Sequence, residues 1–162
     1  MKRPMIRFKQ ELTKAECDEV LKRNTAGVMA VMGDEGYPYA VPLSYIYHDG
    51  KIYFHCGKKG YKIDCMNADS KVCFTVIDKD EIIAEEYTTY FRSVIATGNA
   101  RVAEGQEKFD AFLAMTEKYS GVLPEEMRRK EVAECTQALL YAIDIKEMTG
   151  KEARELAEAK QA

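Results

Sequence analysis

Alternating apolar and polar residues recur along the chain and predict a mainly β protein. A period of two is typical of a strand with one buried face, and β-branched and aromatic side chains strengthen that interpretation. In the segment KIYFHC, for example, Ile52, Phe54 and Cys56 fall on one face. Alternation and short apolar runs together predict six strands, at residues 25–32, 37–47, 51–56, 71–78, 90–103 and 138–145.

Three residues within these segments constrain the sheet further. Pro38 and Pro42 lack the N–H that a strand donates to its neighbour, so their strand is expected at an edge of the sheet or with a bulge. Gly98 interrupts a long strand pattern, which predicts a bulge or a bend there.

Segments with helical spacing lie between and after the strands. Thr13 and Glu16 have the spacing of a capping box, which predicts a helix from there to about Arg23. Residues 79–86 are rich in acidic side chains and are predicted to form an exposed connection. The other predicted helices lie at about 61–68, 108–119 and 124–135, and from about residue 149.

The order of these elements predicts the fold class. Most strands follow one another as hairpins and the helices come late, so we expect an α+β protein, mainly β, built as an antiparallel barrel. Closing the sheet protects the edges of such long strands. The 162 residues contain no internal repeat, low-complexity tract or linker, which predicts one domain over residues 1–162.

Charge and composition exclude several classes of function. The 24 basic and 27 acidic residues give a net charge of −3, which argues against a general nucleic-acid binder. No apolar run approaches the roughly 20 residues of a membrane span, and no signal segment follows the basic N-terminus. Five scattered cysteines without a CxxC pair favour a reduced, cytoplasmic setting. With two histidines and no carboxylate–histidine spacing, no metal site is expected.

One of the two histidines, His55, is the first candidate for a functional site. Alternation places Lys51, Tyr53 and His55 on the face opposite the apolar one, toward solvent, a ligand or a partner subunit. The same alternation directs Cys56 into the core, which argues against a Cys–His nucleophile. An ordinary surface histidine is the alternative interpretation.

A glycine- and lysine-rich turn, GKKGYK, follows His55 directly. Glycines allow a backbone to approach an anion closely, and the next helix offers free N–H groups at its start. Lys62 could add a positive charge to a phosphate there. The turn lacks the spacing of a P-loop, and the chain has no GxGxxG fingerprint, so a solvated turn is the alternative.

A second group of polar side chains lies within apolar strand segments. Arg92 and Ser93 interrupt the segment YFRSVIATGNA, and Arg92 is either a ligand contact or an exposed strand cation. Ser44 in VPLSY is either a phosphate ligand or a hydroxyl satisfied by the backbone.

In order along the chain, GYPYAVPLSYIYHDGKIYFHCGKKGYK, KVCFTVID and YFRSVIATGNARV resemble the pyridoxamine 5′-phosphate oxidase-like split-barrel flavoproteins. The sequence is most similar to their 5-nitroimidazole-resistance (Nim) type, over most of the chain. The resemblance implies a six-stranded antiparallel split β-barrel with flanking helices, which forms a homodimer with FMN between the subunits.

The resemblance also implies roles for particular residues. Its flavin-lining strand matches Pro42, Leu43, Ser44 and Tyr45, and the segment from His55 to Lys62 matches the part that approaches the flavin and its phosphate. The strand along the isoalloxazine edge matches Arg92, Ser93 and Val94. The chain has no RLxP-like C-terminal segment and no tryptophan, so the resemblance does not extend to vitamin B6 oxidation.

The leading hypothesis is therefore an FMN-dependent oxidoreductase that acts on a small electrophilic molecule, a nitroaromatic compound being one candidate. In this hypothesis His55 is a proton donor or stacking partner, and NAD(P)H is a candidate electron donor. A non-enzymatic protein that binds flavin or haem on the same scaffold is the alternative, and a flavin-free structural dimer is a third.

Overall fold

The predicted strand segments form one antiparallel sheet in the computed structural model, which describes residues 4–135 and 137–160. The strand order is β3-β2-β6-β7-β8-β5-β4, and β1 pairs with the outer part of β8. The strands are β1 (Glu11–Leu12), β2 (Ala26–Met32), β3 (Pro38–Ser44), β4 (Ile46–His48), β5 (Lys51–Cys56), β6 (Lys71–Ile83), β7 (Thr88–Val102) and β8 (Leu139–Glu152).

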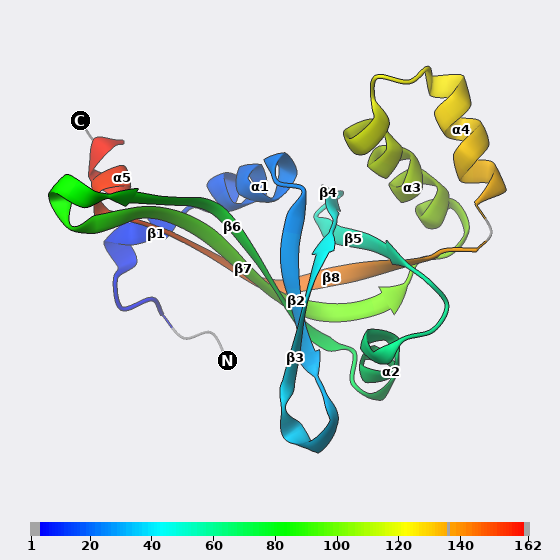
Figure 1. Cartoon of the computed structure of the whole chain (residues 1–162), viewed down its shortest axis with the longest axis horizontal. Coiled ribbons are helices and arrows are strands. Elements are labelled where there is room, and N and C mark those ends of the chain that lie inside the picture. Colours follow the sequence, from blue (N-terminus) through cyan, green and yellow to red (C-terminus); the bar gives the residue numbers. More distant parts are fainter. Residues whose placement is uncertain (1–3, 136, 161–162) are drawn as a thin grey trace.

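Helices flank this sheet, as Figure 1 shows. The capping box predicted at Thr13 and Glu16 is present and begins the first helix. None of the helices in the described part of the chain is long and apolar enough to cross a membrane. The helices are α1 (Lys14–Arg23), α2 (Tyr61–Ala68), α3 (Gly105–Ser120), α4 (Glu125–Glu134) and α5 (Arg154–Ala159), with 3-10 turns at Phe8–Gln10, Asp34–Gly36 and Ala84–Glu86.

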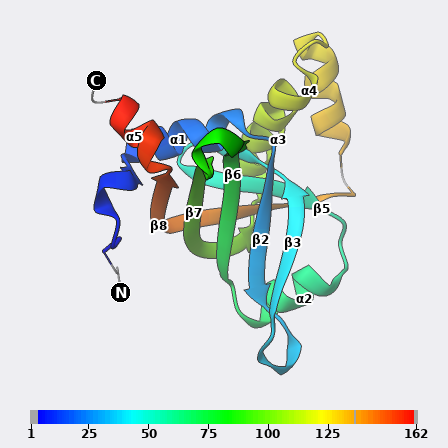
Figure 2. The ribbon, with the colours of Figure 1, turned by 60° about the vertical axis from the view of Figure 1, so that its left-hand side comes forward.

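Tyr45 joins the two ends of the sheet. β3 and β4 are the terminal strands in the sheet order, yet Tyr45 alone separates them in the sequence. The sheet therefore curls until its two edge strands meet, without pairing to each other, at this residue. The result is a barrel split along one line, with β7, β6, β2 and β3 side by side on the face seen in Figure 2.

Buried contacts hold Tyr45 on this line. Its side chain is 0% exposed, and its hydroxyl donates a hydrogen bond of 2.8 Å to the carbonyl of Leu21 near the end of α1. Carbonyls in the last turn of a helix lack a helical partner, so this bond satisfies a group that would otherwise be unpaired. The ring of Tyr45 also packs edge-on against Phe74, with centroids 5.0 Å apart.

The core has two parts, one on each face of the sheet. The larger part fills the barrel, where inward side chains such as Met29, Phe54 and Phe74 meet buried residues of α1 and α2. The smaller part lies outside the barrel, where Tyr53 and Leu140 pack against α3. The strands β4 and β5 and residues 139–143 of β8 are therefore covered on both faces.

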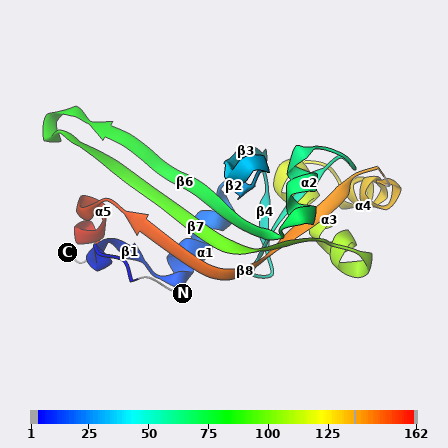
Figure 3. The ribbon, with the colours of Figure 1, turned by 90° about the horizontal axis from the view of Figure 1, so that it is seen from below.

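The hairpin of β6 and β7 extends beyond the other strands as an arm, which is clear in Figure 3. β8 pairs with β7 only as far as Arg92, so residues 79–83 and 88–91 pair mainly with each other. The sequence analysis predicted an exposed connection at 79–86. That prediction is wrong for residues 79–83, because this largely exposed stretch has no apolar alternation to reveal it as a strand.

The edge strand and the irregularity at Gly98 are as predicted, whereas two element boundaries differ. β3 is an edge strand, as its prolines indicated, and the pairing of β7 with β8 shifts register at Gly98. The helix expected from about residue 149 begins only at Arg154, because β8 continues to Glu152 in pairing with β7. The single strand predicted at 37–47 is β3 and β4, divided at Tyr45.

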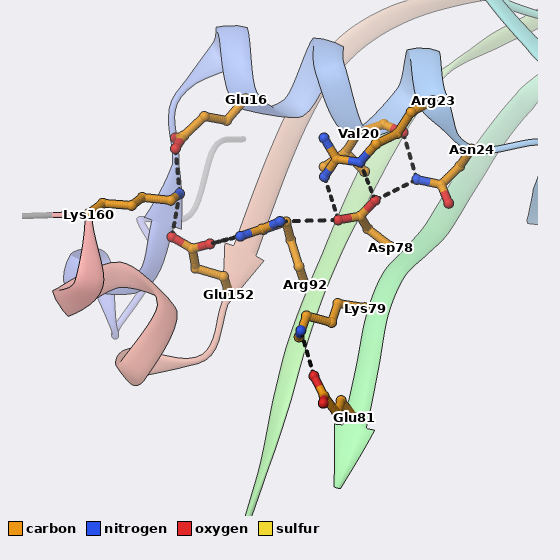
Figure 4. Close-up of polar contacts among 10 residues, drawn as sticks. All are labelled: Glu16, Val20, Arg23, Asn24, Asp78, Lys79, Glu81, Arg92, Glu152 and Lys160. Carbon is orange, nitrogen blue, oxygen red and sulfur yellow. Dashed lines mark hydrogen bonds and ion pairs between the residues drawn. The ribbon is translucent and has the colours of Figure 1, made fainter. Parts of the chain in front are cut away.

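A chain of ion pairs closes the end of the barrel beside α1 (Figure 4). A register shift between Ile77 and Lys79 leaves Asp78 as the extra residue of a β-bulge. Its carboxylate accepts hydrogen bonds from Arg23 at 2.6 and 2.5 Å, from Asn24 at 2.8 Å and from Arg92 at 3.4 Å.

The chain of charges continues from Arg92 toward the C-terminus. Arg92 donates to the buried carboxylate of Glu152 at 3.0 Å, and Lys160 pairs with both Glu152 and Glu16 (Figure 4). The hydrogen bonds from Lys160 and from the backbone N–H of Thr13 lower the pKa of Glu16 to about 2. Opposite charges thus alternate from α1 to the residue after α5.

Tyr45→Phe tests the contact at the split of the barrel. The variant keeps the ring and removes the hydroxyl, so it leaves the buried carbonyl of Leu21 without its partner. We expect the free energy of unfolding to fall by about 1–3 kcal/mol, measured by urea denaturation. Tyr37→Phe, at a position that is 73% exposed, is the matched control and should change stability little. Equal stability of the two variants would contradict the role given to this bond.

Asp78→Asn tests the ion-pair chain. Burial raises the pKa of Asp78, but hydrogen bonds from Arg23, Asn24 and Arg92 outweigh that effect and lower the pKa below its ordinary value of 3.8. A carboxyl group with a lowered pKa stabilises the fold fully above its unfolded pKa, and this contribution is lost as the pH falls through the folded pKa. We expect a loss of about 1.5–3 kcal/mol at pH 7.

The difference between wild type and Asp78→Asn should begin to shrink below about pH 3.8, where the carboxyl of the unfolded chain takes up a proton, and should be lost as the pH falls through the lower pKa of the folded protein. Urea denaturation at pH 7, 5 and 3 measures this trend. Asp80→Asn, at an exposed position on the same strand, is the control. A difference of the same size at pH 3 and pH 7 would show that charge is not the source of the effect.

Candidate functional site

Ser44 and His55 meet where the barrel is split. β3 ends at Ser44, and β4 pairs with β5 only at Lys51–Tyr53, so His55 lies beyond the end of that pairing. Both side chains line one cavity of about 380 Å³, which α3 and α4 close from outside the barrel. The structure thus brings together two residues that the sequence analysis selected from separate motifs.

The helices supply the apolar wall of this cavity. Phe112 lies beside His55, with ring centroids 6.4 Å apart, and Met115 follows on the same face of α3. Val132 of α4 and Ala138 complete the wall. From the sequence, residues 108–119 were predicted only as a helix, without a role in a site. Nothing in its spacing distinguishes a side chain that lines a cavity from one that fills a core.

Two hydroxyl groups in the cavity wall are held by backbone carbonyls. The carbonyls of Thr25, at 2.7 Å, and Tyr45, at 2.8 Å, share the single hydroxyl proton of Tyr119, and Thr116 donates to the carbonyl of Leu113 at 2.8 Å. The Tyr119 bonds also tie α3 to the residue at the split of the barrel. A hydrogen bond therefore connects the wall of the cavity directly to the split of the barrel.

His55 is exposed and Cys56 is buried, as alternation along β5 predicted. Tyr53 differs from the prediction, because its side chain is only 2% exposed beneath α3 and its hydroxyl donates to Glu107 at 3.0 Å. The outward face of β5 is thus buried in the smaller core at Tyr53 and is exposed at His55, near the end of the strand. Burial raises the pKa of Cys56, with a smaller opposite effect from Lys62, so this thiol is a weak nucleophile.

Lys62 lies in the first turn of α2, close to the end of β5. Gly60 precedes that helix with a φ of 145°, a conformation that side chains with a Cβ rarely adopt, so a glycine is required there. Lys62 is half-buried and does not line the cavity of Ser44 and His55. The structure places it on the element that follows His55, without a direct contact between the two.

Arg92 lies at the opposite end of the sheet from His55. His55 pairs with Leu140 and Arg92 pairs with Glu152, so twelve residues of β8 separate the two positions. At about 3.3 Å per residue, the separation along the strand is on the order of 40 Å. Arg92 is also bound to two carboxylates. Within one chain, it does not share a site with His55.

The remaining predicted residues divide between the two faces of the sheet. Tyr45 and Val94 are 0% exposed, so their side chains belong to the core, and the half-buried Leu43 packs against it. Pro42 is exposed and Ser93 is half-buried, both on the outward face of the barrel.

One row of side chains on that outward face carries no charge, between neighbouring rows that include Glu147 and Lys151. The strand pairing places one row of side chains across five strands, and none of them is ionisable. Apolar residues of the row are well exposed, Ile95 being 45% and Val28 38% accessible to solvent. The row consists of Pro42, Val28, Thr75, Ile95 and Thr149.

The family of the chain follows from a comparison with known protein families. The model described as pyridoxamine 5′-phosphate oxidase matches residues 13–152, which include the strands β2 to β8 and the residues that line the cavity. The chain belongs to the pyridoxamine 5′-phosphate oxidase family. The family resemblance inferred from the VPLSY and IYFH segments is confirmed. No curated protein matches the sequence.

Solved structures share the fold of this family member. A candidate 5-nitroimidazole antibiotic resistance protein from Bacteroides thetaiotaomicron aligns with a TM-score of 0.71 and 21% identity, over 88% of this chain and 86% of that protein. A conserved hypothetical protein from Mycobacterium tuberculosis aligns with a TM-score of 0.78 and 21% identity, over 94% and 92% of the two chains.

A third structure is described as an FAD- and haem-binding protein from Mycobacterium smegmatis. It aligns with a TM-score of 0.71 and 18% identity, over 95% of this chain and 80% of that protein. At such identities the matches establish a common architecture. They confirm the predicted split-barrel α+β fold, with short additional strands beyond the six expected.

Proposed function

We propose that the protein is an FMN-dependent oxidoreductase that acts on a small electrophilic molecule. The observation that carries this proposal is the meeting of Ser44 and His55 at the split of the barrel, beside an apolar cavity. Membership of the pyridoxamine 5′-phosphate oxidase family and the flavin-binding description of a structural neighbour support a flavin as the cofactor.

The residues at the split fit a flavin. β3 is the terminal strand of the described sheet, so the backbone groups on its outer edge are available to the polar edge of an isoalloxazine ring. Pro42 and Ser44 are exposed on this strand. The glycine turn and Lys62 would hold the phosphate, with Lys62 as a point charge.

The electron transfer is the chemistry that a bound flavin supplies. The chain contributes position and protons: Ser44 orients a polar group at the end of β3, and His55 donates a proton to the substrate or stacks against it. Nitroaromatic compounds are small electrophiles, and we propose them as the substrate class. Retention of a flavin without turnover is the second candidate function, favoured by the FAD- and haem-binding description of the Mycobacterium smegmatis neighbour.

A homodimer would reconcile the positions of the predicted residues. His55 and Arg92 lie at opposite ends of β8, so they can serve one flavin only if each comes from a different chain. The uncharged row across β3, β2, β6, β7 and β8 is the surface that we assign to the second copy, because exposed apolar rows are typical of interaction sites. In this arrangement Arg92 and Ser93 approach the flavin held by the partner.

Flavin binding is the first test of this proposal. We expect purified protein to be yellow, or to bind added FMN with a micromolar or tighter dissociation constant and a shifted flavin absorption band. Lys62→Ala should weaken binding by about tenfold, as expected for the loss of a charge-assisted contact to phosphate. Lys130→Ala, at an exposed position on α4, is the control. Absence of FMN binding to wild-type protein would sink the proposal.

Turnover then separates the enzyme from the binding protein. Bound flavin is reduced with NAD(P)H or dithionite, and its reoxidation by nitroaromatic acceptors is followed by absorbance. Reoxidation faster than that of free FMN, and slower in His55→Ala, supports the oxidoreductase. Reoxidation no faster than that of free FMN supports the binding protein.

Ile95→Glu tests the dimer. A carboxylate within the uncharged row should convert a dimer to a monomer in size-exclusion chromatography and weaken FMN binding, while the circular dichroism spectrum stays unchanged. Val122→Glu places the same charge at a position that is 96% exposed between α3 and α4, and should do neither. A monomeric wild-type protein that still binds FMN tightly would overturn the two-chain site.

A further inference from the structure

We infer that the cavity between β5, α3 and α4 is a compartment for a small, uncharged and largely apolar molecule, separate from the volume that a flavin occupies. The inference rests on the proposed function in one respect, because the occupant is taken to be the substrate. The compartment itself is argued from its size, its charge and its polar groups.

The size and lining of the cavity suit a small molecule. A volume of about 380 Å³ lies within the range of small-ligand pockets, which begin at about 300 Å³. Phe112, Met115, Val132 and Ala138 give it an apolar wall from four positions on the helical side. Such a wall favours apolar ligands, because burying their apolar surface against it is favourable, whereas a charged ligand would lose hydration that the wall does not replace.

The charge of the lining selects against anions. Among the described residues that line the cavity there is no lysine or arginine, and Glu131 is the single carboxylate. Lys108 lies 5.8 Å from the ring centroid of Phe112 but does not line the cavity. A phosphate ester needs cationic partners to offset its lost hydration. Pyridoxamine 5′-phosphate and similar anions are therefore poor ligands for this compartment.

The polar groups of the compartment give a bound molecule one orientation. Thr116 and Tyr119 already donate to backbone carbonyls, so their protons are engaged. His55 and Ser44 lie on the strand side, at the split of the barrel. Ser120 and Glu131 also line the cavity, on the helical side. A ligand whose polar end pairs with His55 would place its apolar body against Phe112, Met115 and Val132. The polar end then lies nearest the proposed flavin.

A neutral fluorescent probe tests the compartment directly. Prodan, an uncharged naphthalene with one carbonyl group, emits at shorter wavelength in an apolar site, and the chain has no tryptophan to interfere. We expect saturable binding in the micromolar range. The anionic naphthalene sulfonate ANS should bind at least tenfold more weakly. Equal binding of the two dyes would overturn the selection against anions.

Two matched substitutions locate the probe. Ala138→Phe fills the cavity and should weaken prodan binding at least tenfold, whereas Ala133→Phe adds the same ring at an exposed position on α4 and should not. Circular dichroism confirms that both variants are folded. A folded Ala138→Phe protein that binds prodan like wild type would overturn the inference.

A chemical readout on wild-type protein is independent of those variants. Cys135 and Cys73 are both half-buried, and Cys135 lines the cavity while Cys73 lies on the outward sheet face. Prodan should slow the alkylation of Cys135 by N-ethylmaleimide at least fivefold and leave Cys73 unchanged, measured by mass spectrometry of peptides. Equal labelling of Cys135 with and without prodan would contradict the proposed location.

The same experiment distinguishes this inference from the proposed function. If the protein fails to bind FMN but prodan still protects Cys135, the compartment stands and the flavin proposal fails. If FMN displaces prodan one for one, the cavity is part of the flavin site, and the separate compartment is wrong.

Discussion

The buried side chain of Tyr45 is the constraint on which the arrangement of the barrel depends. A sheet whose terminal strands are consecutive in the sequence must curl back on itself, and Tyr45 occupies the single position between them. Its hydroxyl is bonded to α1, its carbonyl accepts from α3 and its N–H donates to Thr25 at 3.1 Å. One residue therefore ties the seam of the barrel to helices on two sides.

The candidate site is a consequence of that seam. β3 and β4 do not pair with each other, and the cavity that Ser44 and His55 line lies where these strands separate, with its outer wall supplied by α3 and α4. The contacts of Tyr119 with the carbonyls of Thr25 and Tyr45 fix the position of α3 beside the split of the barrel. The apolar face of α3 thus has two roles: Phe112 and Met115 belong to the second core, and both also line the cavity.

The sequence analysis predicted much of this protein correctly, and its errors have physical reasons. The bounds of β5 and α2 agree with the prediction because alternation and the glycine turn act locally. The strand character of residues 79–83 was missed because this stretch is largely exposed and has no apolar alternation. The outward face of β5 was expected to face solvent, a ligand or a partner subunit. Tyr53 on that face is instead buried, because α3, some fifty residues later in the sequence, packs on it.

The site residues illustrate the same difference. Alternation alone determined that His55 points away from the barrel and that Cys56 points into it, since neighbouring side chains of a strand face opposite ways. Only the tertiary structure decided that Ser44 joins His55 and that Arg92 does not. Those relations depend on strand order, on a bulge that directs Asp78 toward Arg92, and on where the sheet closes. A local pattern determines which face a residue occupies, whereas the residues that share that face are brought together by long-range packing.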